Sequence, residues 1–131
     1  MAYEIPEEEE VERIILKILH MRGVVESQAE LHREVMKHLE RKNKNYRLSG
    51  RRMRIIALNS GHVGIEIRYR LTDKEVESFE ICPVCGSKMV KISNSTLDGS
   101  RVIIGFRCTR CPYWTGKRLR VPVRYIFRYK K

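Results

Sequence analysis

Two pairs of cysteines constrain what this chain can fold into more than any other feature. Cys82 and Cys85 stand in CPVC, Cys108 and Cys111 stand in CTRC, and 22 residues separate the two pairs. Two thiolates three positions apart on a tight turn can point at one metal ion, and a second such turn completes a tetrahedral set of sulfurs that suits a structural Zn²⁺. Two disulfides, or four unrelated thiols, are the alternatives, and the paired spacing disfavours both.

Positive charge is concentrated towards the C-terminal side of the sequence. Residues 1–40 carry a net charge of −5 and residues 41–131 carry +16. A well-solvated thermophilic surface is one explanation, since the chain is rich in Glu, Lys and Arg and has a single Gln, but such a surface normally intersperses both signs. The segregation therefore favours a polyanionic partner, and we expect a nucleic acid.

Apolar periodicity predicts three helices in the first half of the chain. The first is expected over residues 6–22, opened by Pro6 and ended by Gly23, and residues 24–25 form a short extended link. A capping box, Ser27 with Glu30, opens a second helix that runs to about Arg41. Ser49 caps a third helix over about residues 50–59.

The period then changes from 3.6 to 2. Residues 62–71 alternate as a half-buried strand, residues 72–74 supply a turn, and residues 76–81 are expected to return as a second strand. Three helices followed by a β-hairpin is the order of a winged helix-turn-helix, with residues 62–81 as the wing. A generic small α+β core is the alternative.

Further strands surround and follow the cysteines. Residues 88–93 and 101–107 flank an Asp-Gly hairpin turn at Asp98, and a long alternating strand covers about 117–130. Pro122 cannot donate to a ladder, so we expect an edge strand there. The fold class predicted is α+β: an N-terminal winged helix-turn-helix domain (residues 1–75) and a C-terminal four-cysteine zinc-ribbon domain with an antiparallel sheet (residues 76–131).

Arginines on these elements are the candidate nucleic-acid contacts. Those before and on the third helix would approach a major groove, and those of the wing and of the last strand would meet phosphates. An arginine-lined edge also guards against sheet aggregation, which is the alternative for the last strand. The candidates are Arg47, Arg51, Arg52 and Arg54 near the third helix, Arg68 and Arg70 on the wing, and Arg118, Arg120 and Arg124 on the last strand.

The chain resembles a family of archaeal proteins, described as predicted transcriptional regulators, in which a winged helix-turn-helix is fused to a C-terminal zinc ribbon. The resemblance rests on CPVCGSKM, TLDGSRVIIGFRC, CTRCPYWTG and VPVRYIF in the ribbon and on element order before it. It implies that the four cysteines are zinc ligands and that the helix around Arg51–Leu58 reads DNA. The α subunit of archaeal transcription factor E has the same order of modules.

These observations predict a DNA-binding transcriptional regulator whose partner is double-stranded DNA. Docking on RNA polymerase and RNA binding, with Trp114 and neighbouring aromatics stacking bases, are the alternatives. No P-loop, H-E-x-x-H or G-x-S-x-G motif occurs and four thiolates leave zinc no open position, so we expect no enzyme activity. An acidic N-terminus and the lack of a long apolar run predict a cytoplasmic location without a membrane partner. A first helix that is apolar on two sides would permit a homodimer.

Overall fold

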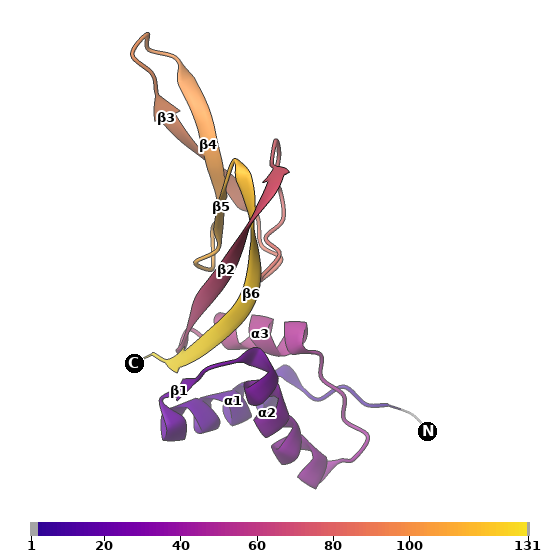
Figure 1. Cartoon of the computed structure of the whole chain (residues 1–131). Coiled ribbons are helices and arrows are strands. Elements are labelled where there is room, and N and C mark those ends of the chain that lie inside the picture. Colours follow the sequence, from indigo (N-terminus) through magenta and orange to yellow (C-terminus); the bar gives the residue numbers. More distant parts are fainter. Residues whose placement is uncertain (1–2, 131) are drawn as a thin grey trace. The chain divides into compact units, whose positions relative to one another are not determined.

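The computed structural model describes residues 3–130 and shows a mixed α+β protein (Figure 1). Three helices precede most of the strands, and the strands form two antiparallel sheets. The elements are α1 (Glu8–Arg22), β1 (Val24–Val25), α2 (Gln28–Lys42), α3 (Gly50–Asn59), β2 (Val63–Glu75), β3 (Met89–Ser95), β4 (Arg101–Cys108), β5 (Trp114–Gly116) and β6 (Arg118–Tyr129).

The three predicted helices are confirmed, and local chemistry explains their ends. The Oγ of Ser27 accepts a hydrogen bond from the Glu30 amide at the start of α2, and the Oγ of Ser49 accepts one from the Arg52 amide at the start of α3. Gly23 ends α1 at a φ of 77°, a conformation that favours glycine. These local contacts define the starts of α2 and α3 and the end of α1.

The helices bury one apolar stripe each. Val11, Ile15 and Leu19 of α1 are fully buried, as are Leu31, Val35 and Leu39 of α2 and Met53 and Ala57 of α3. Each large aliphatic side chain removed from water in this way stabilises the fold by about 1.5–3 kcal/mol. The resulting core holds α3 and the segment before it in place.

The chain divides into two compact units. Among the described residues, the helical unit comprises residues 3–66 together with residues 124–130, and the strand unit comprises Ile67–Val123. The chain enters the strand unit along β2 and leaves it along β6. No single cut of the chain, such as the predicted one between residues 75 and 76, separates these two units.

The first sheet has the strand order β1-β6-β2 (Figure 1). Val24 and Val25 of β1 pair with Arg128 and Phe127 of β6, so a strand from the start of the chain pairs with the last strand. β6 therefore lies between β1 and β2, and the prediction of an edge strand at Pro122 is wrong for the strand as a whole. Because β1 is only two residues long and pairs with Phe127 and Arg128, it does not reach Pro122. In this sheet β6 is therefore flanked at Pro122 by β2 and not by β1.

The predicted return strand over residues 76–81 is wrong. β2 continues through the expected turn to Glu75, and its neighbour in the sheet is β6. The Oγ1 of Thr72 donates a hydrogen bond to the Leu119 carbonyl (2.9 Å), and the Val76 amide donates one to the Lys117 carbonyl (2.7 Å). The alternation of residues 76–81 is blurred, whereas β6 alternates over twelve residues and provides the better partner.

The second sheet has the order β3-β4-β5 and lies within the strand unit. The predicted hairpin between β3 and β4 is confirmed, with Gly99 at a φ of 88° in its turn. The Asp98 carboxylate accepts hydrogen bonds from the amide and hydroxyl of Ser100 and from the Thr96 hydroxyl, and these bonds lower the pKa of Asp98 to about 2. The β3–β4 turn is thus held by its own side chains.

Candidate functional site

The four cysteines come together at the end of the second sheet where β3 begins and β4 ends. Cys82 and Cys85 lie on the turn before β3, Cys108 ends β4, and Cys111 lies on the turn before β5. Gly86 follows the first pair at a φ of 78°, and its amide donates a hydrogen bond to the Cys82 carbonyl (2.9 Å). This tight turn aims both sulfurs of the first pair in one direction.

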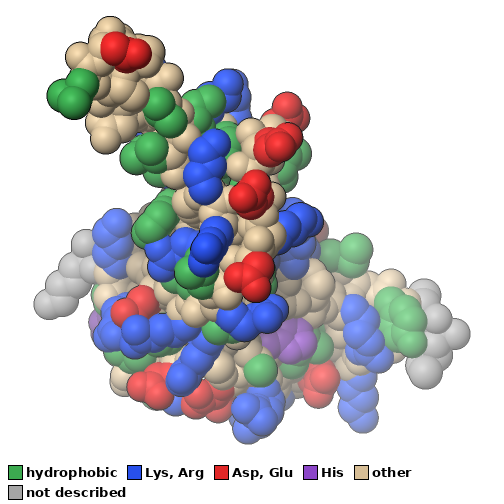
Figure 2. Space-filling model, turned by 45° about the horizontal axis from the view of Figure 1, so that its top comes forward, with side chains coloured by type: hydrophobic (Ala, Val, Ile, Leu, Met, Phe, Trp, Pro, Cys, Tyr) green, Lys and Arg blue, Asp and Glu red, His purple; other side chains and the backbone are tan. Residues whose placement is uncertain are grey.

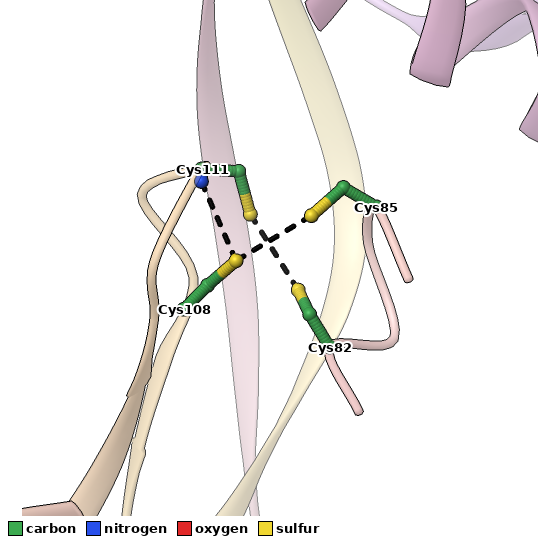
Figure 3. Close-up of side chains that lie close together, drawn as sticks. All are labelled: Cys82, Cys85, Cys108 and Cys111. Carbon is green, nitrogen blue, oxygen red and sulfur yellow. Dashed lines mark hydrogen bonds between the residues drawn. The ribbon is translucent and has the colours of Figure 1, made fainter. Parts of the chain in front are cut away.

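The four sulfurs point towards a common centre (Figure 3). The Sγ atoms of Cys82 and Cys111 lie 3.5 Å apart, those of Cys85 and Cys108 lie 3.4 Å apart, and all four lie within 4.8 Å of one another. Sulfurs at about 2.3 Å from a central ion in a tetrahedron would be separated by about 3.8 Å. All four cysteines are free, so the set can hold a metal ion.

Backbone amides supply the second layer of this centre. The Val84 amide donates to the Sγ of Cys82 (3.4 Å), and the amides of Arg110 and Cys111 donate to the Sγ of Cys108 (3.3 and 3.4 Å). Such bonds orient sulfur ligands and stabilise negative charge on them.

Proton sharing between two of the free thiols also favours a metal site at the four cysteines. The hydrogen bond between Cys82 and Cys111 lowers the pKa of Cys82 to about 5 and, together with burial, raises the pKa of Cys111. Burial also raises the pKa of Cys108. A cation at the centre would replace protons that these thiols otherwise hold.

The arginines near α3 divide into exposed and inward-facing side chains. Arg47 and Arg51 are exposed, and the Arg47 guanidinium lies over the ring of Tyr3 (4.6 Å to its centroid). Arg52 is partly exposed, and its Nη1 donates to the Pro6 carbonyl (3.0 Å). Arg51 is therefore the most exposed of the arginines on α3.

Arg54 differs from its neighbours because it is buried, with 6% of its surface exposed. Its Nη1 donates to the Gln28 Oε1 (2.6 Å), and its guanidinium lies 4.5 Å from the centroid of the Tyr125 ring. The expectation that Arg54 approaches a groove does not fit this position, since a guanidinium packed on an aromatic ring in the core does not reach a partner.

The candidates on β2 and β6 are mostly exposed. Arg68, Arg70 and Arg118 face solvent. Arg124 is exposed too, but its Nε donates to the Glu26 carbonyl (2.7 Å) and its Nη2 lies 3.4 Å from the Glu26 carboxylate. Arg120 is partly buried and stacks on two aromatic rings. The structure thus leaves Arg68, Arg70 and Arg118 as the more accessible cations of these strands.

A groove on α2 holds basic residues that the sequence analysis did not predict as nucleic-acid contacts. Arg33, Lys37 and Arg41 recur every fourth residue and so share one face of the helix. Lys44 and Arg47, from the link to α3, complete a groove of about 920 Å³ with five Lys or Arg and one Glu. We call it the α2 groove, and its lining residues are His32, Arg33, Met36, Lys37, Glu40, Arg41, Lys44 and Arg47. The four-residue spacing was the signal that could have found it.

Lys and Arg side chains are numerous on the face of the molecule that Figure 2 shows, with fewer acidic groups among them.

No family model matches the sequence, and no curated protein or solved structure is significantly similar to it. Within residues 3–130, each helix is too short or too polar to cross a membrane. Fold and site together define a mixed α+β protein with a four-cysteine centre able to hold a metal ion.

Proposed function

We propose that this protein is a DNA-binding transcriptional regulator built on a winged helix-turn-helix, with a zinc ribbon placed between the two strands of its wing. The sheet order β1-β6-β2 supports the winged helix. In that fold the short strand after the first helix pairs with the last wing strand, which in turn pairs with the strand that follows the third helix. Here β6 takes the place of the last wing strand, and residues 76–117 are inserted before it.

The observation that carries the proposal is the α2 groove. Its five cations line one continuous hollow, and its exposed members include Arg33, Lys37 and Arg41. Phosphates of a DNA backbone would neutralise such a row, and release of counterions would supply much of the affinity. We assign base reading to Arg51, because it is exposed at the start of α3 and Arg bound to guanine is the commonest specific contact.

Zinc is the metal we assign to the four cysteines. Four sulfur ligands from two C-x2-C turns suit tetrahedral Zn²⁺, and a closed set of four leaves no position for a reacting water. The ion would stabilise the strand unit. No catalytic step is assigned to the protein.

Selection of bound sequences from a random duplex pool tests the proposal. We expect enrichment of a motif by the native protein, and a changed or lost base preference for Arg51→Ala. A variant with Arg33, Lys37 and Arg41 changed to Ala should weaken binding to all duplexes about equally. Arg128→Ala is the matched control, because Arg128 lies in the helical unit and near Glu66 (3.5 Å) rather than in the α2 groove.

Two outcomes would overturn the proposal. One is duplex binding that ignores sequence and is unaffected by the α2-groove variant. The other is a set of cellular partners that survives nuclease digestion in a pull-down, which would favour docking on RNA polymerase, the alternative expected from the sequence.

A further inference from the structure

A second groove lies within the strand unit and has a different chemistry from the α2 groove. Residues of β2, β5 and β6 surround a hollow of about 570 Å³, which is within the range of about 300–1,000 Å³ typical of small-ligand sites. We call it the Trp114 groove. Its lining residues are Tyr69, Leu71, Trp114, Gly116, Lys117, Arg118 and Arg120.

Arg120 is stacked on the two aromatic rings of this groove. Its guanidinium carbon lies 3.9 Å from the centroid of the Trp114 ring and 4.3 Å from that of the Tyr69 ring. The backbone on either side is fixed, because the Arg120 amide donates to the Thr115 hydroxyl (3.0 Å) and its carbonyl accepts from the Tyr113 hydroxyl (2.8 Å). The planar cation is therefore held in position before any ligand arrives.

The stack alone does not explain the rest of the groove. If Arg120 served only to hold Trp114 and Tyr69 together, this would explain the ring faces that it covers. It would not explain why Trp114 keeps 43% of its surface exposed and Leu71 keeps 62%. Lys117 and Arg118 are exposed beside them, and within the described part of the chain no Asp or Glu lines the groove. A large exposed indole among three cations is a combination that points to a ligand.

The ligand that fits has a flat ring and negative charge. The cations disfavour a positively charged guest, and the exposed part of the Trp114 indole offers a stacking surface of the kind that unpaired bases use. Bases in a duplex are already stacked on their neighbours and would not present a free face. Phosphates on either side of an unpaired base would meet Lys117 and Arg118.

We propose that the Trp114 groove binds single-stranded nucleic acid by stacking an unpaired base on Trp114. This site is separate from the duplex-binding surfaces proposed for the helical unit, so either can fail without the other. The single tryptophan of the chain keeps 43% of its surface exposed, whereas its neighbour Tyr113 is buried (1% exposed), so Trp114 is the side chain of these two that an unpaired base can reach.

The chain has one tryptophan, so its fluorescence reports on this groove directly. Titration with a single-stranded thymidine oligonucleotide should quench that fluorescence and saturate. An oligonucleotide of the same length with abasic sites throughout carries the same phosphates and should quench little. A matching duplex should also quench little, and a uridine oligonucleotide shows whether RNA and DNA strands bind alike.

Substitutions test the groove with a labelled strand and fluorescence anisotropy. Trp114→Leu keeps the apolar bulk and removes the indole, and it should weaken strand binding by roughly tenfold, the order expected for one stacked base. Trp114→Phe should fall between this variant and the native protein. Arg101→Ala is the charge control, since Arg101 lies at the far end of β4 and donates to Ser93. Equal thermal midpoints establish that the variants fold.

Equal quenching by the abasic and thymidine strands would overturn base stacking, and so would native affinity in a folded Trp114→Leu variant. Duplex binding is measured in parallel for the native protein and for the variant in which Arg33, Lys37 and Arg41 of the α2 groove are changed to Ala. If the duplex still binds and Trp114 does not respond to strands, the inference fails while the proposed function stands.

Discussion

The guanidinium of Arg54 in α3 lies over the ring of Tyr125 in β6, 4.5 Å from its centroid. The same guanidinium donates a hydrogen bond to Gln28 at the start of α2. One side chain thus connects two helices and the last strand of the helical unit, although the three residues lie far apart in the sequence.

Replacing Arg54 with Ala should destabilise the helical unit by about 2 kcal/mol. The change removes the stacking on Tyr125 and leaves the Gln28 side chain without its hydrogen-bond donor. Chemical denaturation followed by helical circular dichroism measures the loss. Arg51→Ala is the control, because Arg51 is exposed on the same helix and should change stability by no more than about 0.5 kcal/mol. Equal stability of the two variants would contradict the role of Arg54.

The salt dependence of DNA binding should identify the residues that contact phosphates. The logarithm of the affinity should fall linearly with the logarithm of salt concentration, and each phosphate contact removed should reduce the slope by roughly 0.9. Changing Arg33, Lys37 and Arg41 to Ala should therefore reduce it by about 2.7. Binding isotherms at several salt concentrations give the slopes. An unchanged slope would show that the α2 groove does not meet the DNA backbone.

Removing the metal should unfold the strand unit while the helices persist. The second sheet buries few large side chains, and a metal ion would replace the core that so small a unit lacks. Chelation, or Cys82→Ser, should change the near-ultraviolet signal of Trp114 and leave most helical circular dichroism intact. Zinc titration should restore the native protein and should fail to restore the variant. A Trp114 signal indifferent to chelation would refute this view.

His38 should titrate below its ordinary pKa of 6.5. Burial lowers its pKa first, and the positive charges of Arg41 on α2 and of Lys17 and Arg13 on α1 lower it further, against the opposing effect of Glu34. The unfolded chain then binds the proton more readily than the folded one. The contribution of His38 to stability is complete above pH 6.5 and declines as the pH falls towards the folded pKa.

Nuclear magnetic resonance of the His38 ring measures the midpoint directly. Arg41→Gln should raise it, because one of the lowering charges is lost. The effect on stability is small, since much of the imidazole is screened by solvent. A midpoint at or above 6.5 in the native protein would contradict the prediction.

Much of the helical architecture could be predicted because its causes are local. Ser27 and Ser49 cap helices with their own neighbours, and Gly23 ends one through its own backbone conformation. The convergence of the four cysteines also followed from two short turns and a hairpin, with Asp98 and Gly99 supplying the turn between them. In each case the decisive contacts are close in sequence.

The partner of β2 could not be predicted in the same way. The choice between residues 76–81 and β6 depends on pairing across more than 40 residues, as the bond from Thr72 to Leu119 illustrates. The inward position of Arg54 was hidden for a related reason, since its ring partner Tyr125 lies 71 positions away. The α2 groove left one signal in the sequence, the helical spacing of Arg33, Lys37 and Arg41, but the closure of the groove by Lys44 and Arg47 depends on how the link to α3 folds.

The pairing of β1 with β6 bears on the order in which the protein is made and folded. As the ribosome adds residues from the N-terminus, α1, α2 and α3 emerge early, but the strand that pairs with Val24 and Val25 is synthesised only after Ile67–Val123. The strand unit, with its four cysteines able to hold a metal ion, can therefore fold while the earlier helices still lack their part of β6. Completion of the helical unit waits for the synthesis of residues 124–130.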